Sequence, residues 1–199
     1  MRLGTVLVVA VVAGALGIAA SFAIHGPGPL LRSEWGQRLV NRAFRATAPP
    51  PPDGLQVALP GAVVPAVTLP VLDGAPLTLP GDLAGRPLLV NFWASWCGPC
   101  IAEMPELDRF ARAQGADGVQ VVGIALDDEA AVRAFLARVP VRYPIPLDSP
   151  GPRDSGVVFG NPRGVLPYTA LLDARGVLVK QKIGPFAHGE IDRWAAGVD

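Results

Sequence analysis

The chain has 199 residues, half of them apolar, and its 17 basic and 17 acidic side chains cancel to a formal net charge of zero. This length suits one domain with accessory segments, and the lack of a basic excess argues against a protein that binds nucleic acid through its charge. Glycine and proline are abundant but gather in linkers and turns, without the internal period of a solenoid.

The N-terminal segment is an uninterrupted apolar run over residues 3–24 that contains no charged residue. It reaches the length of about 20 residues that spans a bilayer, whereas the apolar core of a cleaved signal peptide usually has about 7–15 residues. Residues 1–24 are therefore predicted to be a signal-anchor helix that crosses the inner membrane once, with the domain facing the periplasm or cell exterior. Cleavage after the small residues Ser21 to Ala23 is the alternative.

Residues 25–58 are predicted to connect this anchor to the globular part. Between Leu31 and Phe44, apolar residues recur at helical spacing with arginines on the other face, the pattern of a basic amphipathic helix on a membrane surface. A short solvated helix or disorder is an equal alternative. The same arginines weaken the prediction of orientation, because the positive-inside rule alone would keep them cytoplasmic. Four prolines at 49–52 form a stiff spacer that marks the domain boundary.

The globular domain is predicted to cover residues 59–199, where strand and helix patterns alternate. Strands are expected at 66–69 and 77–79 around the turn Asp73-Gly74, and at 88–93, 119–126, 143–147, 168–172 and 177–183. Helices are expected at 101–112, kinked by Pro105, at 129–139, capped by Asp127 and Asp128, and at 189–197. Residues 149–164 are expected to form a loop with at most one helical turn. Layered packing of this order gives a central sheet with helices on both faces.

The only two cysteines, Cys97 and Cys100, stand between the strand at 88–93 and the helix that follows it. Residues at this spacing share a helix face and lie close enough for a disulfide. At a helix N-terminus, unpaired N–H groups and the helix dipole would lower the pKa of the Cys97 thiol and make it a nucleophile near neutral pH. A C-x-x-C motif in this position strongly indicates a redox-active disulfide.

Other roles for the two cysteines are weaker. A bridge that closes so short a loop removes little entropy from the unfolded chain, so it stabilises poorly. Structural zinc needs four ligands, and the only histidines, His25 and His188, lie far from the pair in sequence. A non-catalytic module that holds a soft ion such as Cu(I) on the two sulfurs is an alternative, although no methionine or histidine cluster supports it. No metal site is predicted.

Residues 91–105, N-F-W-A-S-W-C-G-P-C-I-A-E-M-P, resemble the active-site signature of the membrane-anchored TlpA/ResA-like disulfide reductases of the thioredoxin family. Residues 165–169 resemble the cis-proline loop of that family, and an Asp-x-x-Gly hairpin follows. The resemblance runs from about residue 60 to the C-terminus, and the thiol:disulfide interchange proteins of cytochrome c maturation are a related branch. It implies a thioredoxin-like α/β fold: a central mixed β-sheet, helices on both faces and an extra N-terminal strand pair.

The resemblance also implies roles for single residues. Cys97 would attack the substrate disulfide, and Cys100 would resolve the mixed disulfide. A cis Pro167 would leave the backbone of Leu166 free to pair with an extended substrate segment. Contacts with substrate are expected from Trp96, Gly98, Pro99, Leu166 and Pro167.

Two proton-handling groups of cytoplasmic thioredoxin are missing, since Asn91 replaces a buried aspartate and Gly123 or a neighbour replaces a lysine. The replacement candidate is Glu103, which follows Cys100 on the same helix face and matches a glutamate of the TlpA/ResA-like group. Partial burial would raise the pKa of Glu103 and let it accept the Cys100 proton; a solvated glutamate is the alternative. Glu106 and Asp108 are expected to be solvated.

Together these features predict a membrane-anchored extracytoplasmic thiol–disulfide oxidoreductase that reduces protein disulfides, with cytochrome c or metalloprotein maturation as a client process. Its electrons would come from a membrane thiol donor, and no bound cofactor is expected. A thiol peroxidase of the peroxiredoxin type is the enzymatic alternative, but Ala94 stands where such enzymes need a threonine or serine. The client protein and the donor stay open.

Overall fold

The computed structural model describes residues 34–198. The apolar run at 3–24, predicted to anchor the chain, lies outside this range. None of the helices between residues 34 and 198 combines the length and the hydrophobicity of a membrane-spanning segment. The described residues before position 41, which open helix α3, Glu34–Ala46, belong to a first compact unit, and those from 41 onward form a second.

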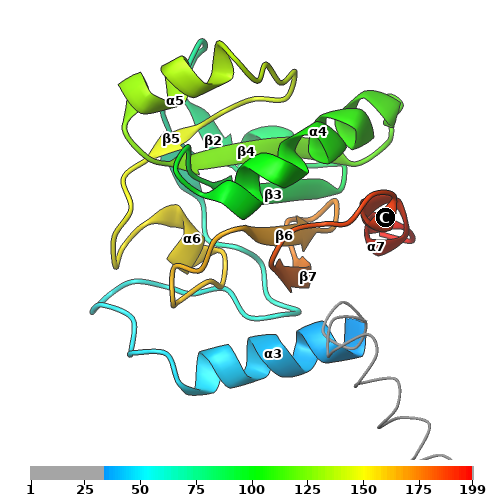
Figure 1. Ribbon diagram of the computed structural model, residues 1–199. Coiled ribbons are helices and arrows are strands. Elements are labelled where there is room, and N and C mark those ends of the chain that lie inside the picture. Colours follow the sequence, from blue (N-terminus) through cyan, green and yellow to red (C-terminus); the bar gives the residue numbers. More distant parts are fainter. Residues whose placement is uncertain (1–33, 199) are drawn as a thin grey trace, which may run out of the picture. The chain divides into compact units, whose positions relative to one another are not determined.

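The second unit is built on a five-stranded mixed sheet with the strand order β5-β4-β3-β6-β7 (Figure 1). The strands are β3 Leu88–Trp93, β4 Gln120–Leu126, β5 Leu147–Asp148, β6 Tyr168–Leu172 and β7 Leu178–Ile183. Strand β3 pairs in parallel with β4 and antiparallel with β6. All six residues of β3 are buried, as its nearly continuous apolar sequence predicts for a central strand covered on both faces.

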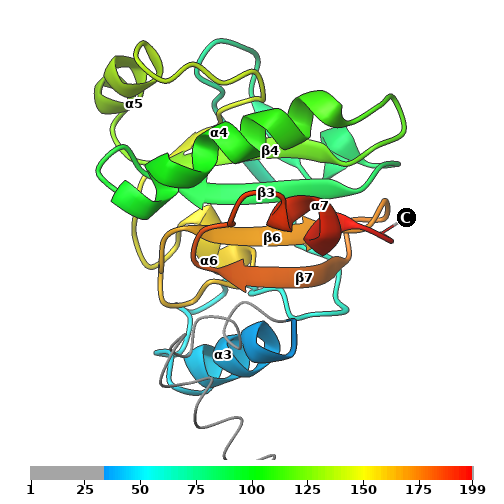
Figure 2. The same ribbon diagram turned by 45° about the vertical axis from the view of Figure 1, so that its right-hand side comes forward.

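The two faces of the sheet carry separate apolar clusters, because successive side chains of a strand point in opposite directions. Leu89 and Trp93 belong to the cluster formed with α4, Gly98–Ala113, α5, Glu129–Leu136, and α7, Glu190–Ala195. Val90 and Phe92 belong to the other cluster, formed with α6, Ser155–Val158, and with an antiparallel strand pair. The strands of this pair are β1, Val67–Leu69, and β2, Leu77–Leu79, and the short helix η1, Gly81–Leu83, follows β2. Helices α4 and α7 lie side by side over the sheet (Figure 2). The predicted thioredoxin-like α/β fold is thus confirmed for the described residues.

The elements differ from the predicted ones mainly at their ends. Helix α4 begins at Gly98 and continues through Pro105. The strand predicted at 143–147 is wrong in its extent, since β5 holds only Leu147–Asp148. Pro144 and Pro146 accept hydrogen bonds from β4 through their carbonyl groups, but proline has no N–H to donate, so a regular ladder cannot form there.

Candidate active site

Cys97 and Cys100 form a disulfide across the first turn of α4, with their Cα atoms 5.3 Å apart. Cys97 is the N-cap of the helix, and its sulfur accepts a hydrogen bond of 3.3 Å from the backbone N–H of Cys100. Pro99 lies in the first turn, where its missing N–H costs nothing and its fixed φ favours the helix. Cys100 is fully buried whereas Cys97 retains 6% exposure, so Cys97 is the sulfur closer to solvent and to the positive end of the helix dipole.

The residues that flank the disulfide are open to solvent. Trp96 is 66% exposed, and Gly98 and Pro99 are also exposed. A large aromatic side chain exposed beside a reactive sulfur offers apolar contact area to a binding partner. Trp96, Gly98 and Pro99 are thus accessible beside Cys97, and their contact with a substrate stays a prediction.

The turn before Cys97 is held by Asp127, at the end of β4. Its Oδ2 accepts hydrogen bonds from the backbone N–H of Ser95 at 2.8 Å and from the Ser95 hydroxyl at 2.6 Å. Burial raises the pKa of Asp127, but these hydrogen bonds outweigh it, so the pKa is lowered overall. The prediction that Asp127 caps the next helix is wrong: Asp128 alone caps α5, through Ala130 and Ala131. Adjacent side chains at a strand end point in different directions, so only one of the two aspartates faces the helix.

The Leu166–Pro167 peptide bond is cis, as predicted. Strand β6 runs antiparallel to β3 with Phe92 opposite Tyr168, so Pro167 lies at the end of the sheet where β3 leads into the cysteines. Among the residues that the structure describes, no hydrogen-bond partner is found for the backbone groups of Leu166. These groups are available to an extended peptide, the mode of binding known as β-strand addition.

Glu103 lies in the second turn of α4 and is 1% exposed. Its Oε1 accepts a hydrogen bond of 2.8 Å from the Asn91 side chain, and its Oε2 accepts one of 3.0 Å from the backbone N–H of Phe186. Burial raises the pKa of Glu103 to about 7, against the opposing effects of these hydrogen bonds and of the charge of Lys182. Glu103 is therefore the buried carboxyl group that was expected, and it exchanges a proton near neutral pH; the solvated alternative is wrong.

Gly123 is in register with Asn91 on the neighbouring strand. Above it lies the ring of Tyr143: a Cβ atom added to Gly123 would meet Tyr143 Cε2 at 2.7 Å. The Tyr143 ring thus occupies the space that a side chain at position 123 would need. Lys182 of β7 was not among the predicted site residues; it is fully buried, and its charge lowers the pKa of Glu103. The sequence feature that could have identified Lys182 is the alternation of side chains along β7, which places residue 182 on the face of the sheet covered by α7.

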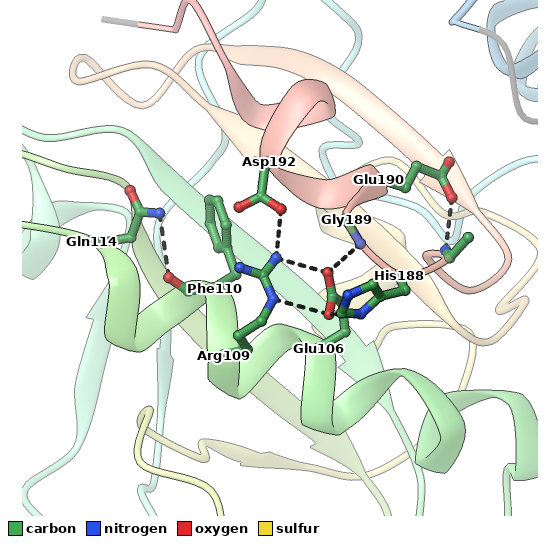
Figure 3. Close-up of polar contacts among 9 residues, drawn as sticks. Glu106, Arg109, Phe110, Gln114, His188, Gly189, Glu190 and Asp192 are labelled. Carbon is green, nitrogen blue, oxygen red and sulfur yellow. Dashed lines mark hydrogen bonds and ion pairs between the residues drawn. The ribbon is translucent and has the colours of Figure 1, made fainter.

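The prediction that Glu106 and Asp108 are solvated is wrong, since they are 9% and 8% exposed. Figure 3 shows Glu106 accepting hydrogen bonds from Arg109 and from the backbone N–H of Gly189, both 2.7 Å, with His188 Nδ1 at 3.1 Å. Hydrogen bonds from Arg109 lower the pKa of Glu106 to about 2. Asp108 accepts a hydrogen bond of 2.9 Å from the Arg142 backbone. Both carboxylates tie α4 to its neighbours and do not reach the cysteines.

No cluster of three or more histidine, cysteine, aspartate or glutamate side chains between residues 34 and 198 is arranged to hold a metal ion.

Comparison with known proteins finds relatives of the domain that carries Cys97 and Cys100. The family model described as Redoxin matches residues 59–196. The sporulation thiol-disulfide oxidoreductase A of Bacillus subtilis is 30% identical over 138 residues, which cover 66% of this chain and 79% of that protein. The thiol:disulfide interchange protein DsbE of Pseudomonas aeruginosa is 36% identical over 137 residues, covering 67% and 71%. For the thiol-disulfide oxidoreductase ResA of Bacillus cereus, 30% identical over 114 residues, the match covers 57% of this chain and only 63% of the relative.

Solved structures agree with these relatives. StoA from Bacillus subtilis matches with a TM-score of 0.55 and 28% identity, covering 67% of this chain and 98% of that chain. The thioredoxin-related protein from Neisseria meningitidis serogroup B matches with a TM-score of 0.53 and 34% identity, covering 61% and 90%. The domain at residues 59–196 is thus similar in sequence and in fold to thiol–disulfide oxidoreductases.

Proposed function

The chain belongs to the redoxin family, and from this premise we propose that it is a thiol–disulfide oxidoreductase that reduces disulfides in extracytoplasmic proteins through Cys97 and Cys100. One observation carries this proposal: the disulfide lies at the N-terminus of α4, and the next turn of the same helix carries a buried carboxyl group with a pKa of about 7.

The first chemical step is attack by the Cys97 thiolate on a substrate disulfide. A bond forms between Cys97 Sγ and one substrate sulfur, and the other substrate sulfur leaves as a thiolate and takes up a proton. The helix N-terminus stabilises the Cys97 thiolate before this attack. The product is a mixed disulfide between Cys97 and the substrate.

In the second step Cys100 attacks Cys97 Sγ, which releases the second substrate thiolate and re-forms the Cys97–Cys100 bond. Two electrons have then passed from the cysteine pair to the substrate. Cys100 is fully buried, so bulk water cannot readily take its proton and a nearby base is needed. Glu103 fits this role because it follows Cys100 by one helical turn, is itself buried, and is half ionised near neutral pH.

The surface around Cys97 supports a protein substrate that presents an extended segment around its disulfide. Trp96 provides exposed apolar area, and Leu166, before the cis Pro167, offers unpaired backbone groups. This combination gives main-chain pairing without strong selection of sequence. It suits a reductase for clients that are not fully folded, such as apoproteins awaiting a haem or a metal.

For location, we propose that residues 1–24 anchor the protein in the inner membrane and that the domain faces the periplasm or the cell exterior, where a membrane thiol donor re-reduces it. The length of the charge-free apolar run supports this topology. Protease added to spheroplasts should digest the domain. Digestion only after lysis would show that the basic residues after the run set the opposite orientation.

The function is tested by trapping. A full-length Cys100→Ala variant should accumulate substrate proteins joined to Cys97 by disulfides that dithiothreitol releases. The matched control is the double variant Cys97→Ala, Cys100→Ala, which should trap none. A Cys100→Ala variant that captures nothing beyond this control, from a wild-type protein that also fails to reduce insulin, would exclude the proposed function.

A further inference from the structure

Four residues in register form a row across the sheet beneath α4. Gly123 of β4 pairs with Asn91 of β3, Asn91 pairs with Thr169 of β6, and Thr169 pairs with Lys182 of β7. Residues directly opposite each other on neighbouring strands share a face of the sheet. Asn91 donates hydrogen bonds both to Glu103 and to Thr169, at 2.8 and 3.0 Å. The row therefore places Lys182 two strands away from Asn91, on the same face of the sheet as the groups that bind Glu103.

Lys182 is only 1% exposed, and a charged ammonium group is costly to bury unless it is paired. Its partner is Glu190, at the start of α7, with Lys182 Nζ 2.7 Å from Glu190 Oε1. The same ammonium lies 5.1 Å from the centre of the Phe186 ring. Glu190 Oε2 also accepts a hydrogen bond of 2.8 Å from the backbone N–H of Ala187. The ion pair thus fixes the segment that leads into α7.

Glu103 is bound to this same segment, because the N–H of Phe186 donates to its Oε2 at 3.0 Å. Two carboxyl groups, Glu103 of α4 and Glu190 of α7, therefore accept hydrogen bonds from adjacent residues of one short stretch of chain, and Lys182 is paired with the second of them. The titratable groups around Glu103 are Lys182 from β7, Glu190 from α7 and Tyr143 from the segment before β5. The two cysteines of α4 are joined in the disulfide and do not titrate. Lys182 is the only cation of this set.

We propose that Lys182 is a positioning residue for Glu103: with Glu190 it fixes the Phe186–Ala187 segment that donates to the carboxylate, and its positive charge favours the ionised form that accepts the Cys100 proton. This inference rests on the proposed function for the role of Glu103 as a base. It makes the buried ion pair part of the proton-transfer site and not merely a tie between β7 and α7.

The proposal and the alternative, in which the ion pair only ties β7 to α7, predict shifts of different sign for the pKa of Glu103. The charge of Lys182 lowers the pKa of Glu103, and the charge of Glu190 raises it. Removing one charge at a time should therefore move the titration of Glu103 in opposite directions. If the pair were only a tie, either substitution would loosen the segment, weaken the hydrogen bond from Phe186 and move the titration upward in both cases.

The experiment is a pH titration of Glu103 in the full-length oxidised protein, followed by NMR of ¹³C-labelled glutamate carboxyl groups. The Glu103→Gln variant identifies the resonance by its loss. In Lys182→Met the midpoint should rise by about half a pH unit or more, and in Glu190→Gln it should fall. Lys182→Arg, which keeps the charge, should stay near the wild-type midpoint.

A matched control is Arg109→Met. Arg109 of α4 pairs with Glu106 of the same helix and with Asp192 of α7 (Figure 3). It makes no hydrogen bond to Glu103, so its loss should leave the midpoint unchanged. Upward shifts in both Lys182→Met and Glu190→Gln, or no shift in either, would overturn the proposal. If Lys182→Met fails to fold, the fall in Glu190→Gln and the retention in Lys182→Arg decide the question.

The titration is measured on the oxidised protein without substrate, so its result can fail or succeed independently of the proposed reductase activity. A Glu103→Gln variant that keeps the wild-type rate and pH profile of disulfide reduction would remove Glu103 from the mechanism. Opposite shifts in the midpoint would still support the link between Lys182 and Glu103.

Discussion

Glu103 and Phe186 are 83 residues apart in the chain, yet the backbone N–H of Phe186 donates a 3.0 Å hydrogen bond to Glu103 Oε2. A carboxyl group buried to this degree would be strongly destabilised in its ionised form without such donors. The hydrogen bonds from Phe186 and Asn91 offset part of that cost, and the result is a pKa of about 7. This balance sets the pH range in which Glu103 can take up a proton.

Glu103→Gln should slow the release of substrate from the mixed disulfide by roughly 10²-fold, the low end for general base catalysis. In the wild type the rate of this step should rise with pH through about 7, because the ionised fraction of Glu103 rises there. In the variant that inflection should vanish, and mixed disulfide should accumulate. Stopped-flow reduction of a peptide disulfide at several pH values measures both effects. An unchanged pH profile would assign the base to another group.

The same substitution should stabilise the protein at alkaline pH. The pKa of Glu103 rises from 4.5 to about 7 on folding, so the native state binds the proton more tightly than the unfolded state does. The contribution of Glu103 to the free energy of unfolding is therefore highest below about pH 4.5 and falls as pH rises to about 7. Glu103→Gln should remove up to roughly 3 kcal/mol of this loss. Urea unfolding of both proteins at pH 5 and pH 8 tests it; equal pH dependence would contradict a raised pKa.

The sequence predicted the elements whose signals are local. Strand β6, Tyr168–Leu172, was predicted with its observed bounds because an apolar run ends at a hairpin turn. The place of Cys97 at a helix N-terminus followed from the strand–turn–helix pattern, although α4 begins at Gly98, three residues before the predicted start. Burial and a raised pKa for Glu103 were also predicted, from its position on the face of the helix that carries Cys100.

The rest depended on partners distant in the chain. The sequence around Glu106 is that of a solvated helix residue, and its burial depends on the contact with Gly189. Asp127 has the position of a helix cap, but its carboxylate binds Ser95 instead. Lys182 and Glu190 carry opposite charges only eight residues apart, but nothing local shows that β7 and α7 bring them together over Glu103. The acids and bases of this site are set by tertiary packing, which periodicity alone does not reveal.

Gly123→Ala should destabilise the protein by about 1–3 kcal/mol, the usual cost of overpacking a core. The added Cβ would lie 2.7 Å from Tyr143 Cε2, and the Tyr143 ring is buried and cannot swing into solvent. Gly115→Ala is the matched control, since its Cβ would meet nothing within 4 Å. Thermal unfolding compares the two; a Gly123→Ala protein as stable as the control would show that the ring moves freely.

Cys97 should be the thiol that iodoacetamide labels first in the reduced protein at neutral pH. It is the N-cap of α4 and retains 6% exposure, whereas Cys100 is fully buried. The helix terminus favours the thiolate of Cys97, and only the thiolate reacts. Peptide mapping after brief labelling identifies the modified residue. Label found first on Cys100 would reverse the roles of attacking and resolving cysteine.

Asp127→Ala should loosen the turn that carries the disulfide. It removes the acceptor for both the N–H and the hydroxyl of Ser95, and leaving these partly buried donors unpaired costs about 1–3 kcal/mol. The pKa of Asp127 is lowered on folding, so its contribution is present above its unfolded pKa and is lost as pH falls through the lowered folded pKa. Asp127→Asn keeps an acceptor oxygen and should lose less stability than Asp127→Ala.

The double-mutant cycle of Asp127→Ala with Ser95→Ala isolates this contact. Ser95→Ala removes the hydroxyl but keeps the backbone N–H, so the coupling free energy reports the side-chain hydrogen bond of 2.6 Å. We expect a coupling of about 0.5–1.5 kcal/mol near neutral pH, measured by urea unfolding of the oxidised proteins. The coupling should shrink in acid, because protonated Asp127 is a weaker acceptor. Strictly additive effects of the two substitutions would mean that Asp127 holds the turn through the backbone of Ser95 alone.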